Sequence, residues 1–149
     1  MTLSVFKAME LNGTALSAQR TRLDVVSSNL ANAQTTRTPE GGPYRRRDVS
    51  LATDLARGRF GEVLHDQLME PTQTVKVQEI MKDQAAPKMV YDPHHPDADA
   101  AGYVAMPNIN AVEEMVDMIT VMRTYQANLN VFKSLKDMTT RALGLGRNL

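Results

Sequence analysis

The chain contains no cysteine and no tryptophan, and aromatic residues make up only 5% of its 149 residues. Without cysteine there is no disulfide to hold the fold together and no thiol nucleophile for catalysis. We therefore expect a chain that suits reducing and oxidising compartments equally.

An excess of charge of either sign is also missing. Lysine plus arginine and aspartate plus glutamate each number 17, which gives a formal net charge of zero. Dedicated nucleic-acid binders normally carry a basic surplus gathered on one face. The balance argues against nucleic acid, and against an anionic membrane surface, as the main partner.

Long apolar runs and a recognisable leader are absent as well. Residues 1–6 lack a basic stretch followed by an apolar one, and no run approaches the roughly 18 apolar residues of a membrane-spanning helix. If the protein leaves the cytoplasm, we expect a route that needs no cleaved signal peptide.

The chain does have heptad-like apolar patterns at both of its ends. They predict long helices over about residues 3–33 and 110–143, and a division into three parts: an N-terminal assembly helix over 1–35, a loop and small β-containing region over 36–109, and a C-terminal assembly helix over 110–149. We expect a mainly α protein whose terminal helices form a coiled coil, with each other or with other chains.

The N-terminal pattern contains polar positions that weaken it. Asn12 and Gln19 occupy one of its heptad positions, where polar side chains fix register at a cost in stability. Gly13 costs roughly 1 kcal/mol relative to alanine in a helix. We expect this helix to be marginal alone and to become ordered when packed.

The C-terminal helix has a strong start signal. Asn110 is placed to be its N-cap, with Glu113 at the third helical position as in a capping box. Its apolar positions are rich in methionine, a flexible residue that adapts to several neighbours; the chain has ten.

We predict a subunit interface along both helices. Its members are Met9, Leu16, Leu23, Asn29, Leu30, Asn32, Met115, Met118, Met122, Tyr125, Leu129, Phe132 and Leu135. For Asn29 and Asn32 two roles remain open: capping the end of the first helix, or hydrogen bonding across to a neighbouring subunit.

The middle region carries turn and strand signals. Pro39, Gly41, Gly42 and Pro43 exclude a helix and favour a turn that leads into an extended segment. Residues 74–81 and 87–91 are predicted strands. Residues 48–55 and 60–69 fit either a short helix or a strand.

One cluster could bind a metal. It comprises Asp92, His94, His95, Asp97 and Asp99, and such side chains suit a divalent cation. Adjacent ligands on a loop crossed by two prolines converge poorly, so we favour a hydrogen-bonded turn and predict no metal and no cofactor.

No pattern predicts catalysis. Arg45, Arg46 and Arg47 could contact phosphate, but without a basic surplus a solvated strand or salt bridges between subunits is the preferred interpretation. The glycines before them are not followed by the lysine and helix of a phosphate loop, and no serine lies in a nucleophile elbow. We expect no enzyme.

Two stretches resemble a known family. They are SSNLANAQTTRTPEGGPYRRR at residues 27–47 and VYDPHHPDADAAGYVAMPNINAVEEMVDMITVMRTYQANLNVFKSLKDM at residues 90–138. Together they are similar to bacterial flagellar rod and hook proteins, and in particular to a member of the proximal rod. They cover about half the chain, whereas residues 48–88 are less diagnostic.

The resemblance implies a structural, tube-building axial subunit of the flagellar basal body, required for motility. Such proteins pass through the flagellar type III export apparatus uncleaved and stack helically into the periplasm-spanning rod, with their terminal helices forming the inner tube. The implied partners are further copies, other rod proteins, and ring and export-apparatus proteins, with no nucleic acid and no small-molecule substrate.

Two other functions are considered beside this one. The same helices could form the closed oligomer of a coiled-coil adaptor or chaperone. The cluster at residues 92–99 could serve a metal-dependent hydrolase, which would bind zinc or manganese in a fixed ratio.

Overall fold

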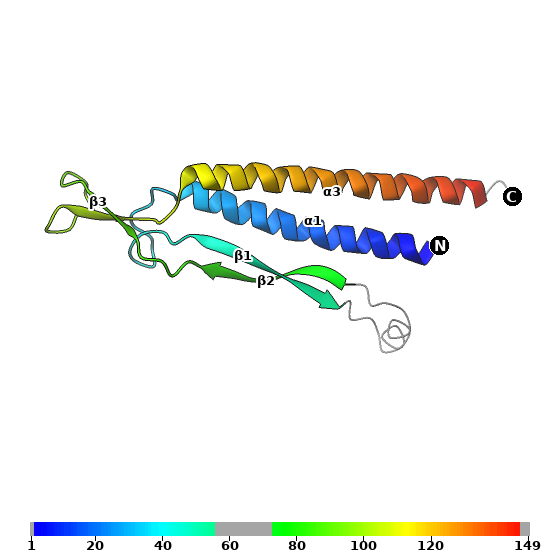
Figure 1. Ribbon diagram of the computed structural model, residues 1–149, viewed down its shortest axis with the longest axis horizontal. Coiled ribbons are helices and arrows are strands. Elements are labelled where there is room, and N and C mark those ends of the chain that lie inside the picture. The colour runs from blue at the N-terminus through cyan, green and yellow to red at the C-terminus, as the bar shows by residue number, and fades with distance from the viewer. Residues whose placement is uncertain (1, 56–72, 147–149) are drawn as a thin grey trace. The chain divides into compact units, whose positions relative to one another are not determined.

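The computed structural model describes residues 2–55 and 73–146, and in these ranges the chain begins and ends with a long helix and has a small β region between them in sequence (Figure 1). The elements are α1 (Thr2–Ala31), β1 (Arg47–Leu55), β2 (Gln73–Lys82), β3 (Lys88–Tyr91), β4 (Tyr103–Met106) and α3 (Ala111–Gly146). The predicted combination of two terminal helices with a small β-containing middle is confirmed. The uncertain prediction for residues 60–69 lies outside the described residues.

The described chain divides into two compact units, and each helix contributes to both. The first unit contains residues 2–21, 51–55, 73–78 and 122–146. The second unit contains residues 22–50 and 79–121. The second unit therefore brings together the end of α1, the start of β1, the β3–β4 pair and the start of α3.

Helix α1 ends where the sequence places a side-chain amide. Asn32 Nδ2 donates to the carbonyl of Ser28 at 2.8 Å, and Thr35 Oγ1 donates to Asn32 Oδ1 at 3.2 Å. The side chain thus adds a second hydrogen bond to a carbonyl of the last turn, which also accepts the backbone N–H of Asn32 at 3.1 Å. The capping role predicted for Asn32 is confirmed.

Helix α3 begins at the predicted cap but with a different reciprocal bond. The N–H of Val112 donates to Asn110 Oδ1 at 3.1 Å, as expected for an N-cap. Glu113 Oε1 accepts from the side-chain amide of Asn110 at 3.0 Å, whereas a capping box uses the backbone N–H of the cap residue. The helix also runs on to Gly146, because glycine weakens a helix without forbidding it.

The β region consists of two two-stranded sheets. Residues 48–55, for which helix and strand were both open, form β1, and β1 pairs with β2. Strands β3 and β4 pair antiparallel, with Lys88 opposite Met106 and Tyr91 opposite Tyr103. Sequence analysis predicted strands at β2 and β3 but gave no assignment for β4.

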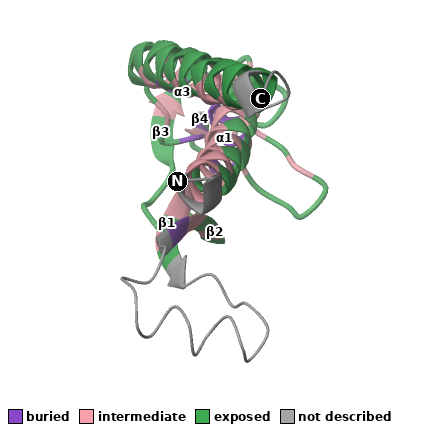
Figure 2. Ribbon diagram, turned by 90° about the vertical axis from the view of Figure 1, so that its right-hand side faces the viewer, coloured by how far each residue is buried: buried purple, intermediate pink, exposed green. Residues whose placement is uncertain are grey.

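The described core is small and lies mainly in the second unit. Its buried apolar residues are Ala18, Val25, Val26, Tyr44, Val104 and Val121. Figure 2 shows little purple and much pink and green along the two helices. Most heptad residues of a single chain are therefore only half-buried or exposed.

Candidate functional site

The most completely bonded group in the second unit is the side chain of Asn29 near the end of α1. It is fully buried, and its Nδ2 donates to the carbonyl of Arg47 at 2.8 Å and to Glu114 Oε2 at 3.1 Å. Its Oδ1 accepts from the N–H of Arg47 at 2.9 Å and from the Tyr44 hydroxyl at 3.1 Å. All four hydrogen-bonding positions of the amide are thus filled within one chain.

A carboxylate from α3 completes this cluster. Glu114 is 2% exposed, and its Oε1 accepts a 2.6 Å bond from Arg46 Nε. That hydrogen bond is the main reason why the pKa of Arg46 is raised above its usual value, so the guanidinium stays charged. Asp117, one turn further along α3, lies 4.0 Å from the same guanidinium.

Tyr44 connects the cluster to its surroundings. Its hydroxyl gives its proton to Asn29, so it accepts from Ser28 Oγ, 3.2 Å away. The guanidinium carbon of Arg47 lies 5.6 Å from the centre of the Tyr44 ring, within cation–π range. We call Asn29, Tyr44, Arg46, Glu114 and the backbone of Arg47 the polar junction, because they join α1, the start of β1 and α3.

The three consecutive arginines have three different environments within the chain. Arg46 pairs with Glu114, while Arg45 Nη1 donates to Gln84 Oε1 at 3.3 Å. Arg45 and Arg47 line an open hollow of about 380 Å³, together with Lys82. Residues 44–46 precede β1, which begins at Arg47. The ion pair of Arg46 lies within the chain, whereas the sequence favoured a solvated strand or salt bridges between subunits.

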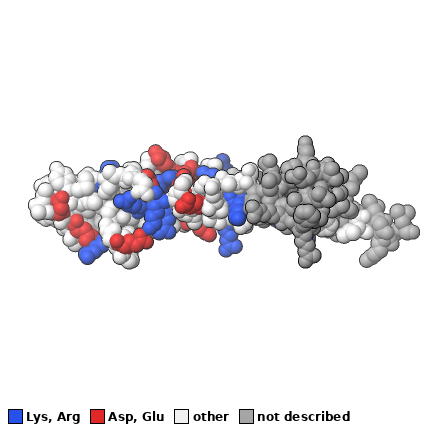
Figure 3. Space-filling model, turned by 90° about the horizontal axis from the view of Figure 1, so that it is seen from below, with Lys and Arg blue, Asp and Glu red and all other residues white. Residues whose placement is uncertain are grey.

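Charges of both signs are mixed over the face of the described residues that Figure 3 shows. One example is Lys82, whose Nζ lies 2.6 Å from Glu40 Oε2 at the rim of the same hollow. The hydrogen bond from Lys82 is the main cause that lowers the pKa of the Glu40 carboxyl. Both side chains are exposed, so this pair contributes little to stability.

The acidic cluster at the tip of the β3–β4 hairpin forms a hydrogen-bonded turn, as preferred from the sequence. Asp92 Oδ1 accepts from the N–H of His94, and Asp99 Oδ1 accepts from the N–H groups of Ala101 and Tyr103. Asp97 bonds Thr36 Oγ1 at 2.8 Å. Among residues 2–55 and 73–146, no group of three or more such side chains is arranged to hold a metal ion.

The residues predicted for the interface fall into three classes by burial. Most are half-buried: Met9, Leu16, Leu23, Leu30, Asn32, Met118, Tyr125, Leu129, Phe132 and Leu135. Met115 and Met122 are each 45% exposed. Asn29 is buried, and its amide makes its hydrogen bonds inside the chain. Its place in a subunit interface stays a prediction.

Exposed apolar residues gather on one side of α3 near its start. Val112, Met115, Val116, Ile119 and Met122 each have another member three or four residues away, which places them on one face of a helix. Their exposed fractions lie between 45% and 64%. We call these five residues the exposed stripe.

Sequence reasoning missed the polar junction and the stripe for different reasons. The junction joins Asn29 to Glu114 across 85 positions, and no local pattern indicates such a contact. The stripe was partly visible, because the heptad assignment contained Met115 and Met122 but not Val112, Val116 or Ile119.

Comparison with known proteins shows that two family models match the segments that contain Asn29 and Glu114. The family model of flagella basal body rod proteins matches residues 9–37, and that of the C-terminal part of the flagellar basal body rod FlgEFG proteins matches residues 100–145. Flagellar basal-body rod protein FlgC of Borreliella burgdorferi is 44% identical over 149 residues, covering 96% of this chain and 98% of the relative. The chain belongs to the flagellar basal-body rod protein family.

Two further relatives of this rod protein extend the comparison. FlgC of Salmonella typhimurium is 40% identical over 145 residues, covering 97% of this chain and all of the relative. FlgC of Bacillus subtilis is 40% identical over 153 residues, with the same coverage. The rod protein is a structural subunit of the flagellar basal body and not an enzyme.

The two matched segments contain the α1 and α3 sides of the polar junction. Asn29 lies in the first segment and Glu114 in the second, whereas Tyr44 and Arg46 lie between them. In the described residues, neither helix of the rod protein has an apolar stretch long enough to cross a membrane. As a rod subunit, it assembles with other components of the flagellar rod.

Proposed function

We propose that this subunit belongs to the proximal part of the rod and is built into it through its two terminal helices. In this proposal, α1 and α3 pack as coiled-coil helices, and neighbouring copies and other rod proteins continue the packing helically. The contacts include Met9, Leu16, Leu23, Leu30, Asn32 and the interface residues predicted on α3 from Met115 to Leu135. The same helices line a tube, and the middle region faces outward.

The observation that carries this proposal is the amount of apolar surface left on α3. Five large apolar side chains of the exposed stripe stand at 45% exposure or more on a single helix face. A contiguous exposed apolar patch on a soluble chain usually marks a contact with another protein. Methionine at two of the five positions suits neighbours that are not identical.

Location and partners follow from the proposed assembly. The rod spans the periplasm, and the subunit reaches it through the flagellar type III export apparatus without a cleaved signal. Ring and export-apparatus proteins are then partners in addition to rod proteins. The absence of cysteine supports this route, because no thiol can mispair in an oxidising space.

Replacing the exposed methionines of the stripe tests the assembly proposal directly. Met115→Glu combined with Met122→Glu places two charges where apolar contact is proposed, so the protein should be missing from isolated basal bodies and motility should be lost. Ala127→Glu is the control, because it adds a charge at an exposed position of α3 that is not part of the stripe. This variant should still be found in isolated basal bodies. Equal incorporation of both variants contradicts the proposal.

A second measurement concerns folding on assembly. The isolated monomer should show much less helix by circular dichroism than the 30 residues of α1 and 36 of α3 contain, because assembly contacts offset the cost of ordering. A fully helical monomer that resists protease would contradict the proposal that the terminal helices fold only on assembly.

The closed coiled-coil adaptor is the competing function. Sedimentation separates the two, because an adaptor forms a discrete oligomer that persists on dilution. A rod subunit of this kind associates weakly in isolation.

A further inference from the structure

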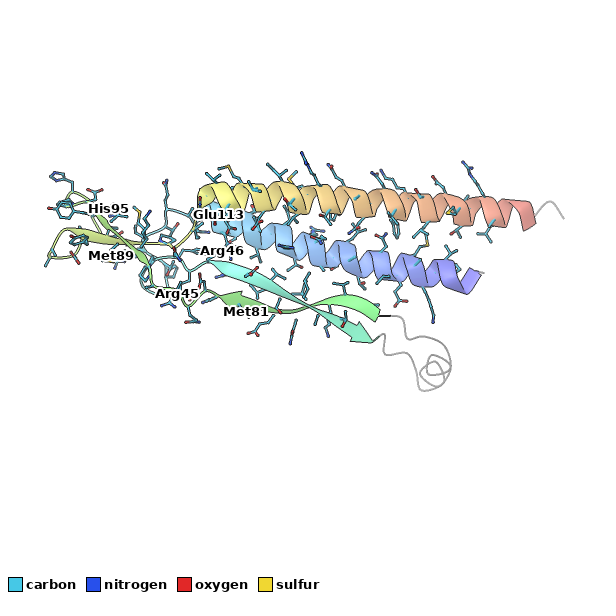
Figure 4. The ribbon with its side chains drawn as sticks, viewed as in Figure 1. Arg45, Arg46, Met81, Met89, His95 and Glu113 are labelled. Carbon is cyan, nitrogen blue, oxygen red and sulfur yellow. The ribbon has the colours of Figure 1, made fainter. Side chains whose placement is uncertain are left out.

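Cationic side chains gather around the open hollow near the start of β1, which we call the cationic hollow. It has a volume of about 380 Å³ and lies within the second unit, and its charged lining consists of Arg37, Arg45, Arg47, Lys82 and Glu40. In the view of Figure 4, Arg46 lies toward the start of α3 and Arg45 lies on the side away from it. Four cations against one carboxylate leave an excess of three positive charges here, in a chain whose formal net charge is zero.

One of these cations, Arg47, is held in position within its own chain. Its backbone N–H and carbonyl bond the Asn29 amide at 2.9 Å and 2.8 Å. Its guanidinium carbon lies 5.6 Å from the centre of the buried Tyr44 ring. Among residues 2–55 and 73–146, no oxygen accepts a hydrogen bond from this guanidinium. A cation that is already positioned and has unused donors loses little conformational freedom when it binds an anion.

The cationic hollow offers its arginines little negative charge of its own. Among the described lining residues the one carboxylate is Glu40, and it lies 2.6 Å from Lys82 Nζ. Arg45 is exposed, and its Nη1 donates to the neutral amide oxygen of Gln84 at 3.3 Å. The described lining therefore leaves no carboxylate for Arg45 or Arg47.

We propose that the cationic hollow binds an acidic segment of a different protein of the flagellar basal body, with carboxylates against Arg45 and Arg47. A planar guanidinium presents paired N–H donors that match the two oxygens of a carboxylate. The volume of about 380 Å³ falls within the roughly 300–1,000 Å³ of ligand-binding clefts, so there is room for side chains and not only for a single ion. This inference rests on the proposed function, because the neighbour is a protein that the subunit meets in the assembled structure.

The acidic clusters of the chain itself match the cationic hollow less well. Described carboxylates gather at the tip of the β3–β4 hairpin and at the start of α3, and both groups are already bonded within the chain. Asp97 accepts from a threonine hydroxyl, and Asp99 accepts from two backbone N–H groups. Glu113 accepts from the side chain of the cap residue, and Glu114 belongs to the polar junction. A second copy would have to give up or share these bonds, so we assign the occupant to a different chain.

Carbodiimide cross-linking of isolated basal bodies tests the contact, because this reagent joins a lysine amine to a carboxylate that lies beside it. The carbodiimide activates the carboxylate, the Lys82 amine attacks the activated carbon, and an amide forms while the reagent leaves as a urea. Glu40→Gln is the starting variant, since it removes the carboxylate that Lys82 would otherwise meet in its own chain. Peptide mass spectrometry should then find Lys82 joined to an aspartate or glutamate of a different protein.

Three further variants, each added to Glu40→Gln, check that the arginines hold the segment in place. Lys82→Arg keeps the charge but has no reactive amine, so the linked peptide should disappear. Arg45→Gln with Arg47→Gln should lower the yield of linkage at least about fivefold, as expected for the loss of two ion pairs. Lys88→Gln removes an exposed positive charge of the same unit outside the described lining of the hollow, and it should leave the yield unchanged.

The outcomes separate this inference from the proposed function. Basal bodies that lack this chain contradict the proposed function. Basal bodies that contain it but show no linkage of Lys82 to a different protein overturn the inference alone, and linkage of Lys82 to a second copy overturns it too. An equal yield with and without the two arginines also rejects it, because the cations then do not hold the segment. If the double arginine variant is not incorporated, Arg45→Gln alone gives the same comparison at an exposed position, where a substitution does not disturb the fold.

Discussion

The two compact units treat buried polar groups in opposite ways. In the second unit, the buried amide of Asn29 makes four hydrogen bonds, and the buried carboxylate of Glu114 accepts from Asn29 and Arg46. In the first unit, the amide oxygens of Asn12 and Gln19 are buried without a partner among the described residues. Helix α1 thus passes from a part with unpartnered buried polar atoms to a part whose buried amide is fully hydrogen-bonded.

This difference indicates where order in the free subunit originates. Buried polar groups with all bonds made fix a single arrangement, whereas unsatisfied ones cost about 1–3 kcal/mol each. We expect the second unit to be the stable part of the free chain. The first unit should depend on neighbouring subunits for its order. Folding on assembly is therefore expected for residues 2–21 of α1 and 122–146 of α3.

The largest expected effect comes from removing the centre of the polar junction. Asn29→Leu should lower the free energy of unfolding of the second unit by about 4 kcal/mol, because it leaves the backbone of Arg47 and one oxygen of Glu114 without partners. Urea unfolding followed by tyrosine fluorescence measures this, since Tyr44, Tyr91 and Tyr103 belong to the second unit.

The matched control for that experiment is Asn130→Leu at an exposed position of α3. It should change stability by no more than about 0.5 kcal/mol. If Asn29→Leu has an effect as small as the control, the contrast between the two units is wrong.

The next largest effect is expected from the ion pair. Arg46→Met should lower the free energy of unfolding of the second unit by about 3 kcal/mol, because Glu114, which is 2% exposed, loses its charged partner. The pKa of Arg46 is raised, so the stability that its ion pair contributes is complete below the ordinary pKa of arginine and is lost only above the raised pKa. The difference in the free energy of unfolding between wild type and Arg46→Met should therefore stay constant from about pH 7 to about pH 10. Urea titrations at several pH values measure it.

Stabilising the first unit should reduce the contrast between the units. Asn12→Leu and Gln19→Leu remove the buried amide oxygens without partners, so each should stabilise the first unit by about 1 kcal/mol. Hydrogen exchange of α1 amides before residue 22 should slow accordingly, while exchange in the second unit stays the same. Faster exchange of these amides in the double variant would show that the unpartnered amide oxygens do not destabilise the first unit.

The smallest effect is expected at an exposed pair of the second unit that lies outside the junction. Glu40→Gln removes the carboxylate bound by Lys82, and both side chains are exposed. Because the pKa of Glu40 is lowered from 4.5, the pair contributes above that value and is lost as pH falls through the lowered pKa. Urea midpoints of wild type and variant should differ slightly near neutral pH and coincide in strong acid or high salt.

Local patterns predicted the elements but not the contacts between them. Asn110 and Glu113 indicated the start of α3 because capping depends on neighbours in sequence, and Asn32 ended α1 for the same reason. The alternation in residues 74–81 predicted β2, whereas residues 48–55 stayed ambiguous, because pairing with β2 is what makes β1 a strand.

Only those residues of the candidate site that follow the heptad spacing of a helix were predicted from the sequence. Heptad spacing found Met115 and Met122 of the exposed stripe, but it could not tell a side chain facing its own chain from one left exposed. Asn29 was noticed as a polar residue near a helix end, and its actual partners lie 15 to 85 positions away. Such distant hydrogen bonds have no signature in a single sequence.

The separations within the polar junction also set an order of folding. Asn29 reaches Arg47 across 18 positions and Glu114 across 85. Closing the longer loop costs about 1.4 kcal/mol more in chain entropy by the logarithmic dependence on loop length. The start of β1 should therefore dock on α1 first, and α3 should be the last segment to join.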